Sequence, residues 1–415
     1  MEDDEIIGLK PHEKEAQGKE EEETSTPSPP GVVSIDLGEH ISELRVSREE
    51  RELRSSEPRP IPEPESIFLG YGKKRFLPFR SRTILGVDLG MHTLKAVELQ
   101  KAWGGVNLVS LGVIELSPQD MPSDGSSNLA RVAALKRFLG GMAERTPIVV
   151  TSLGGSSVVV RQIQLPLIPR GKFFSTIQWE ARRYIPFEKE EMVIDAQIMD
   201  TDKHKKRMDV MVVAVSHALM EAHLGLLSQA GVEPRVVDNH SLALMNSLFR
   251  DSYLRGDETV VMLDIGASTT TLNIFRVGGA YLTRCISIAG NRFTMEIQKR
   301  LGLDYAQAEA MKREKEEVSE IVKPAVDSLV SELRQSLIYY KNQTGKGEFD
   351  RIILCGGSAR LSNLNTYLAQ ELGIPVEIYD PLRKISLDPR VFPRASLQGL
   401  APQLTLALSL ALRGC

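Results

Sequence analysis

Several features that define common protein classes are scarce or missing in this chain of 415 residues. It has three cysteines, Cys285, Cys355 and Cys415, and none of them belongs to a Cys-x-x-Cys pair. This spacing predicts neither a zinc site nor a disulfide framework. No apolar run approaches the roughly 20 residues that a membrane-spanning helix needs. The first residues, Met1 to Glu5, are mostly acidic, so the sequence also predicts no secretory signal.

Acidic charge is concentrated near the N-terminus. Residues 1–66 contain 19 Asp and Glu but 8 Lys and Arg, whereas the whole chain has a net charge of −4. The same segment holds eight of the 22 prolines, and such a composition cannot bury enough apolar surface to offset the entropy lost on ordering. We therefore predict that residues 1–81 form a disordered, acidic, proline-rich extension with a basic end from Lys73 onward. Its most apolar stretch, Val32–Val46, is interpreted as part of this linker.

A pattern of strands and one helix occurs twice. The first copy is predicted as three strands, a helix and a fourth strand at Thr83–Gly90, Thr93–Gln100, Val106–Leu116, Asn128–Glu144 and Pro147–Leu153. The second copy has strands at Thr259–Gly266, Thr269–Val277, Ala280–Ile288 and, after a helical stretch, Arg351–Cys355. Two βββαβ halves predict a duplicated α/β fold with a cleft between the halves.

The repeat divides the rest of the chain into two domains. The first half is predicted at residues 82–257 and the second half at residues 258–415. Residues from about 154 to 234 interrupt the first half with strands and two helices of their own, which predicts a compact α/β insert. A strongly helical stretch from about 291 to 348 predicts a second insert, in the second half.

Each half opens with a strand that ends in Asp-x-Gly. A glycine at this point allows a tight turn and lets backbone N–H groups approach a ligand. Polar groups suited to phosphate oxygens follow the aspartate in both copies, which gives the predicted site residues Asp88, Gly90, Thr93, Lys95, Asp264, Gly266, Ser268 and Thr269. Two carboxylates that face each other across a cleft, Asp88 and Asp264, predict a Mg²⁺ site that acts through water on nucleotide phosphates.

Two further motifs fit the same kind of site. Gly356, Gly357 and Ser358 stand between a buried strand and a helix, where backbone dipoles favour anions. Glu309 and Lys312 lie three residues apart on a helical stretch, so both side chains share one face and are able to reach a ribose or base together. Taken singly, a Gly-Gly pair is an ordinary turn and Glu309 with Lys312 is an ordinary surface ion pair.

These four motifs, in this order, resemble the phosphate and adenosine motifs of the superfamily of actin, heat-shock chaperones and sugar kinases. A narrower resemblance rests on Trp179-Glu180-Ala181 followed by Tyr184-Ile185-Pro186-Phe187, which is similar to the type IV pilus assembly protein PilM family. It covers residues 84–413. The resemblance implies an actin-like, ribonuclease H-like fold in which the two inserts are subdomains 1C and 2B. We expect at least two of Trp179, Tyr184, Ile185 and Phe187 to be core residues of the insert.

The resemblance also implies a function. It predicts a cytoplasmic scaffold of the type IV pilus inner-membrane platform that binds ATP and Mg²⁺ and has at most weak ATPase activity. The implied partner is the N-terminal tail of a PilN-like bitopic membrane protein, bound between the first half and its insert, with other platform components as further partners. The chain would then sit at the cytoplasmic face of the membrane through its partners, with neither a membrane span nor nucleic acid. An FtsA-like division or cytoskeletal ATPase and a small-molecule kinase remain alternatives.

Some residues depart from the family pattern or lack a predicted role. Met91 and His92 stand where PilM proteins tend to have serines, which leaves fewer hydroxyl donors for phosphates. Spacing alone indicates no residue that would orient an attacking water. The histidines are scattered along the chain, and we predict surface or cap roles for His204, His217, His223 and His240.

Overall fold

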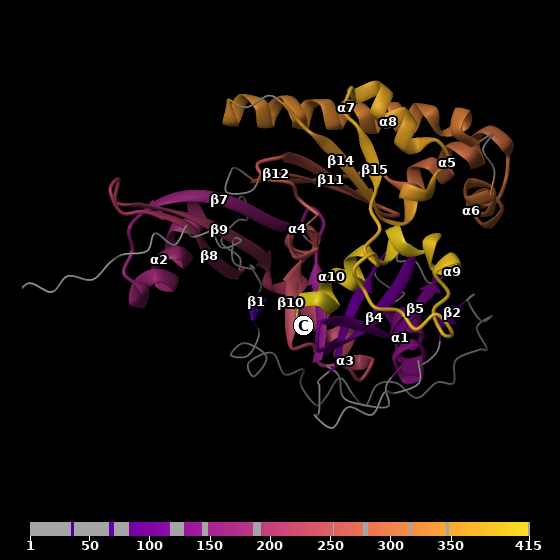
Figure 1. Cartoon of the computed structure of the whole chain (residues 1–415), viewed down its shortest axis with the longest axis horizontal. Helices are drawn as coiled ribbons and strands as arrows, with labels where there is room; N and C mark the ends of the chain where they lie inside the picture. The colour runs from indigo at the N-terminus through magenta and orange to yellow at the C-terminus, as the bar shows by residue number, and fades with distance from the viewer. Residues whose placement is uncertain are drawn as a thin grey trace, which may run out of the picture.

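The computed structural model describes residues 35–36, 66–69, 83–116, 128–142, 148–185, 192–251, 253–276, 281–314, 318–345 and 348–413. Two large sheets enclose α4 (His240–Arg250) and α10 (Thr405–Arg413), with further helices on their outer sides (Figure 1). A smaller sheet projects to one side. Most of the predicted disordered extension lies outside the described residues. Across the described ranges, no helix combines the length and apolarity needed to cross a membrane.

The first large sheet has seven strands. Its central elements are β3 (Thr83–Leu89), β4 (Thr93–Ala102), β5 (Gly105–Glu115), α1 (Asn128–Met142) and β6 (Ile148–Leu153). The strand order is β1-β10-β6-β3-β4-β5-β2, with β3 antiparallel to β4 and parallel to β6. The first five residues of β3 are buried because helices cover both faces of the sheet at this point.

The two outer strands of this sheet come from the N-terminal extension. β1 (Ile35–Asp36) pairs with β10 (Val236–Asn239), and β2 (Ser66–Leu69) pairs with β5. At these six residues the structure differs from the predicted disorder. The physical reason is that sheet edges present unpaired N–H and C=O groups to which even a short extended segment can add hydrogen bonds.

The second large sheet repeats the strand order of the first. It consists of β11 (Thr259–Ile265), β12 (Thr270–Arg276), β13 (Tyr281–Ile286), β14 (Arg351–Cys355) and β15 (Val376–Ile378). Their order is β13-β12-β11-β14-β15, which matches β5-β4-β3-β6-β10 in the first sheet. The helices that accompany this sheet are α5 (Gly290–Leu301), α6 (Tyr305–Glu314), α7 (Val318–Thr344) and α8 (Leu364–Leu372). The predicted duplicated βββαβ fold is therefore confirmed.

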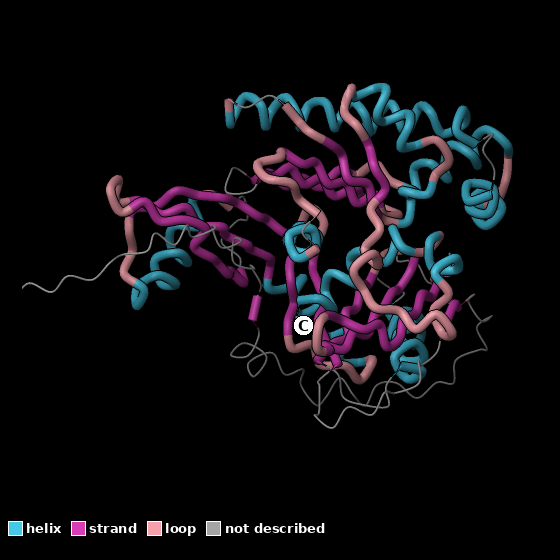
Figure 2. The backbone as a smooth tube through the Cα atoms, viewed as in Figure 1, coloured by secondary structure: helices cyan, strands magenta, loops and turns pink. Residues whose placement is uncertain are grey.

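The projecting unit is a three-stranded sheet with one helix. Its elements are β7 (Val158–Pro166), η3 (Arg170–Lys172), α2 (Phe173–Glu180), η4 (Ala181–Arg183), β8 (Met192–Asp202) and β9 (Arg207–Ser216). The strand order is β7-β9-β8, and Figure 2 shows these strands as a separate group. The helix that follows, α3 (His217–Gln229), packs Leu226 and Leu227 against Leu135 and Phe138 of α1. Met220 of the same helix lies in a core cluster with Met211 of β9, so α3 contacts both the first half and the insert sheet.

The end of the chain returns to the first half. It forms α9 (Arg394–Gln398), η6 (Ala401–Leu404) and α10 (Thr405–Arg413), and α10 also touches α4 (His240–Arg250). Leu404 and Leu408 share a core cluster with Val97 of β4 and Leu111 of β5. Leu406 and Leu410 of the same helix share another core cluster with Val260 and Met262 of β11, so α10 packs against both sheets.

Candidate functional site

A cavity of about 730 Å³ lies between the two halves. Its walls include both Asp-x-Gly turns, the glycine turn after β14 and one face of α6. The structure brings all thirteen predicted site residues to it: Asp88, Gly90, Thr93, Lys95, Asp264, Gly266, Ser268, Thr269, Glu309, Lys312, Gly356, Gly357 and Ser358. The carboxyl ends of β3 and β11 meet at this cavity because the two halves face each other with equivalent edges.

The first predicted phosphate loop is the turn from Asp88 to Thr93. Lys95 is the cross-strand neighbour of Asp88, and its Nζ lies 2.8 Å from Asp88 Oδ2. Both side chains are largely buried. A Cβ at Gly90 would fall 2.5 Å from the carbonyl oxygen of Thr93, so this tight turn requires glycine.

The second predicted phosphate loop follows β11 and is braced by the glycine turn after β14. Gly356 has a φ of +92°, and a Cβ there would fall 2.3 Å from Asp264 Oδ1. The Ser358 hydroxyl donates to the carbonyl oxygen of Gly266 at 2.8 Å. The missing side chain of Gly356 lets the end of β11 pack against this turn. A Cβ at Gly357 would have only Gln403 Oε1 nearby, at 4.0 Å, so the backbone of Gly357 is open to a ligand.

Glu309 and Lys312 form an ion pair on the cavity wall, which agrees with the predicted shared face of α6. Lys312 Nζ also donates to Thr294 Oγ1 at 2.8 Å and to the carbonyl oxygen of Gly290 at 3.2 Å. Burial lowers the pKa of Lys312, although Glu309 opposes that effect. Burial would raise the pKa of Glu309, but the charge and hydrogen bond of Lys312 outweigh it and lower that pKa. The lowered pKa of Glu309 favours its carboxylate, and the contacts with Thr294 and Gly290 hold Lys312 in place.

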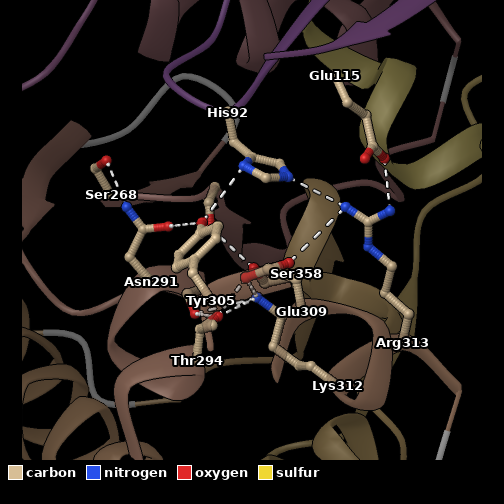
Figure 3. Close-up of polar contacts among 12 residues, drawn as sticks. His92, Glu115, Ser268, Asn291, Thr294, Tyr305, Glu309, Lys312, Arg313 and Ser358 are labelled. Atoms are coloured by element: carbon tan, nitrogen blue, oxygen red, sulfur yellow. Dashed lines mark hydrogen bonds and ion pairs between the residues drawn. The ribbon is translucent and has the colours of Figure 1, made fainter. Parts of the chain in front are cut away.

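A chain of hydrogen bonds joins the two phosphate loops across the cavity (Figure 3). His92 Nδ1 lies 3.4 Å from the Tyr305 hydroxyl, which in turn lies 3.3 Å from Asn291 Oδ1. Asn291 Nδ2 donates to Ser268 Oγ at 3.3 Å. Since His92 belongs to the first loop and Ser268 to the second, the two halves are in contact through polar side chains.

A second cross-cavity contact lies beside this chain. Arg313 of α6 reaches Glu115 of β5 at 2.6 Å, and its Nη2 lies 3.1 Å from His92 Nε2 (Figure 3). Burial lowers the pKa of His92, which favours the neutral ring that accepts a hydrogen bond from Arg313. His92 replaces the expected hydroxyl donors with a group that bridges the cleft.

His240 is a site residue that sequence reasoning missed. Its Nε2 lies 2.6 Å from Asp264 Oδ2, and it is the first residue of α4, whose N-cap is Asn239. Burial alone would disfavour the imidazolium, but the hydrogen bond and charge of Asp264 outweigh that effect and raise the pKa of His240. A surface or cap role is therefore wrong for His240. The available signal was its position after the buried strand β10, equivalent to that of the two aspartates.

Arg131 and His223 form another missed part of the cavity wall. Arg131 Nη2 donates to the carbonyl oxygens of Leu89 and Gly90 at 3.1 and 3.2 Å, which supports the first phosphate loop from behind. His223 of α3 lies 3.2 Å from Thr151 Oγ1 and is also not a surface residue. Both come from helices whose orientation the sequence pattern does not give.

The donor set limits the kind of metal that this cavity could hold. Within the described part of the chain, no group of three or more His, Cys, Asp or Glu side chains is placed to hold a metal ion. Asp88 and Asp264 provide two carboxylates, each already beside a cationic or basic partner. This suits an ion such as Mg²⁺, which keeps several waters and takes most remaining ligands from phosphates.

Comparisons with known proteins give the family and the fold. The family model for the type IV pilus assembly protein PilM matches residues 86–415. A solved PilM-PilN type IV pilus biogenesis complex is similar with a TM-score of 0.72 and 29% identity, covering 80% of this chain and 98% of that chain. The fold is that of actin-like ATPases.

Two other solved structures are more distant. The ethanolamine utilization protein EutJ from Carboxydothermus hydrogenoformans has a TM-score of 0.48 and 14% identity, covering 81% of this chain and 91% of that chain. MreB5 of Spiroplasma citri, bound to AMPPNP, has a TM-score of 0.41 and 13% identity, covering 77% of this chain and 98% of that chain.

Proposed function

The chain belongs to the type IV pilus assembly protein PilM family, and we propose that it is a nucleotide-binding scaffold of the pilus assembly platform. In this proposal ATP and Mg²⁺ bind in the cavity between the halves, and a PilN-like membrane protein binds elsewhere through its N-terminal tail. The observation that supports nucleotide binding best is that two phosphate loops, a glycine turn and a polar helix face line one cavity. A position at the cytoplasmic face of the membrane would then follow from the partner.

The residues present fit a nucleotide and its metal. The loops at Gly90 and Gly266 offer backbone groups to phosphates, and Lys95 adds a positive charge beside Asp88. The ribose or base would lie against the Glu309 and Lys312 pair and the open backbone at Gly357. When bound, Mg²⁺ would neutralise phosphate charge between the two aspartates.

Thermal melting with and without Mg-ATP tests this proposal. A ligand at 100 times its dissociation constant stabilises the folded state by about 2.7 kcal/mol. We expect this shift in the intact protein and its loss in Asp264→Asn and Lys95→Ala. Lys101→Ala is the matched control, because Lys101 is an exposed lysine at the far end of the same strand. An unchanged melting temperature in the intact protein at millimolar Mg-ATP would overturn the proposal.

The partner tail is proposed to bind at the seam between the first half and the insert. Three half-buried apolar residues lie there against a core that both parts share: Val193 of β8, Leu224 of α3 and Val236 of β10. β8 is also an edge strand of the insert sheet, so its outer backbone groups are able to pair with an extended peptide. Affinity would come from one or two apolar anchors and main-chain hydrogen bonds, and would change little with salt.

Titration of a labelled N-terminal peptide from a PilN-like protein tests this seam. Val193→Glu and Leu224→Glu should weaken binding tenfold or more and leave the Mg-ATP shift in place. Ile338→Glu is the control, since Ile338 is 57% exposed on α7 in the other half. Asp264→Asn should keep the peptide and lose the nucleotide shift. Equal peptide affinity in the seam variants and the control would exclude this site.

A further inference from the structure

The insert ends in a basic turn at the far end of its sheet. The turn between β8 and β9 reads Asp202-Lys203-His204-Lys205-Lys206-Arg207, and every residue after Asp202 is exposed. Lys205 pairs with Asp202 at 3.4 Å, whereas Lys203 and Lys206 have no ion pair within the described ranges. Figure 1 shows the insert strands projecting away from the two large sheets. Four cations, set against Asp200, Asp202 and Asp209 of the flanking strands, therefore leave a net positive charge at an outer end of the molecule.

Large apolar side chains are exposed in the segment between β7 and β8, which begins beside this turn. The backbone N–H of Leu167 donates to the carbonyl oxygen of Lys206 at 3.1 Å, which holds the segment leading into α2 against the turn. Leu167 is 38% exposed, Phe174 is 58% exposed and Trp179 is 62% exposed. Tyr184, which follows η4, is 46% exposed. Four such side chains in one short stretch of the chain leave more apolar surface in water than the scattered single residues of an ordinary surface.

These residues are exposed although the insert core is complete. α2 buries Phe173 and Ile177 against the three-stranded sheet, so its inner face already has a partner. On the outer side, the Arg183 guanidinium lies 4.6 Å from the centre of the Trp179 ring. Lys172, at the start of α2, is exposed as well. Exposed cations and an exposed aromatic ring thus occur together at α2 and η4.

From this arrangement we propose that the outer end of the insert docks on an anionic lipid surface. Residues 203–207 would face the charged headgroups, and Leu167, Phe174 and Trp179 would enter the interfacial layer. Basic residues beside an anionic bilayer each strengthen binding by about fivefold, and tryptophan and tyrosine favour the boundary between headgroups and acyl chains. The expectation that the protein lies next to a membrane rests on the proposed function. The basic and apolar surface of the insert is observed independently of that function.

The composition of this surface favours lipid over two other occupants. Proteins that bind single-stranded nucleic acid aim free aromatic faces into a basic groove, but one face of Trp179 is covered by Arg183, and aliphatic Leu167 offers no stacking. The acidic extension, residues 1–66, has the complementary charge but few apolar residues to cover the rings. A bilayer satisfies both the positive charge and the apolar side chains.

Vesicle co-sedimentation of the full chain tests the proposal. We expect binding to mixed vesicles of phosphatidylcholine and phosphatidylglycerol and no binding to phosphatidylcholine alone. Lys203→Ala, Lys205→Ala and Lys206→Ala together should weaken binding on the order of 100-fold. The control triple variant, Lys299→Ala, Arg300→Ala and Lys341→Ala, removes exposed cations from α5 and α7 and should bind like the wild type.

The two tryptophans of the chain provide a site-specific readout. Trp103 is fully exposed in the β4–β5 turn of the first half. In Trp103→Phe the emission reports Trp179 alone, and it should shift to the blue when anionic vesicles are added. In Trp179→Phe the remaining Trp103 should show no shift.

Several results would overturn the proposal. One is equal binding to neutral and anionic vesicles, and another is an equal loss of binding in the two triple variants. A third is a Trp179 that acrylamide cannot reach even without vesicles, which would indicate that the chain's own N-terminal extension covers this surface. Binding of a labelled oligonucleotide that depends on the same lysines, without vesicle binding, would assign the surface to nucleic acid. The Mg-ATP melting shift, measured in the same variants, separates each outcome from a failure of the proposed nucleotide function.

Discussion

The packing of α10 on β3 makes Gly86→Ala a sharp test of the architecture. A Cβ at Gly86 would fall 2.0 Å from the carbonyl oxygen of Ala407 and 2.5 Å from the backbone nitrogen of Ala411. Both atoms belong to the backbone of α10, which is buried along Thr405–Leu412, so no side chain can rotate out of the way. An ordinary contact begins at 3.4 Å, so the strand and the helix would have to move apart to accommodate the added methyl group.

The expected cost follows from the rigidity of this contact. Overpacking a well-packed core typically costs 1 to 3 kcal/mol, and we expect about 3 kcal/mol here because the obstacle is backbone. Gly140→Ala is the matched control in the same half. Gly140 lies in α1 with no atom within 4 Å of its added Cβ, so that variant should gain up to about 1 kcal/mol from the helix preference of alanine.

Urea unfolding followed by far-ultraviolet circular dichroism measures both variants. Helix and strand signals suit this purpose because both tryptophans are exposed and report little on core packing. The unfolding midpoint should fall for Gly86→Ala and stay or rise for Gly140→Ala. If the unfolding free energy of Gly86→Ala lies within about 0.5 kcal/mol of the wild type, as for a neutral surface substitution, α10 does not pack on β3 as described.

Two further predictions concern the cavity. Burial, with a contribution from Arg131, lowers the pKa of His223 to about 4, so its stabilising effect is present above pH 6.5 and is lost as the pH falls toward 4. Between pH 7 and pH 5 the wild type should lose about 2 kcal/mol more unfolding free energy than His223→Gln, and equal losses would contradict this. Glu115 and Arg313 are both more than a third exposed, so a double-mutant cycle should give a coupling below about 1 kcal/mol that disappears in 1 M salt. A coupling well above about 1 kcal/mol, or one that persists in 1 M salt, would contradict a solvent-exposed ion pair here.

Local patterns were sufficient to predict the two sheets and the two Asp-x-Gly turns at the cavity. Buried strands that end in Asp-x-Gly have a strong period and a clear stop, and equivalent strands of a duplicated fold bring their carboxyl ends together. Asp88 and Asp264 were therefore predictable as cavity residues from their position alone. Glu309 and Lys312 were predictable as a pair because helix geometry fixes residues three apart on one face.

The remaining site residues depend on tertiary packing. Arg131 and His223 reach the cavity only because α1 and α3 pack side by side under the first sheet. The return of α10 to the first half was not predictable, since an apolar helix fits either sheet equally well by pattern. His240 follows the apolar residues of β10, which local pattern can indicate. Its contact with Asp264 crosses between the halves, so the sequence alone could not predict it.

His92 departs from the family pattern, and its role in the structure differs from the one that the sequence predicts. In the sequence, His92 stands where the family tends to have serine, and the missing hydroxyl donor predicts weaker contacts to phosphate. In the structure its ring contacts Tyr305 and Arg313 of α6, which belongs to the opposite half. An imidazole is long enough to span this gap, and a serine hydroxyl at the same position is not. A histidine at this position therefore lacks the hydroxyl contacts to a ligand that serines would offer, but it adds contacts that hold the two halves together. Its effect on nucleotide affinity is the sum of this loss and this gain.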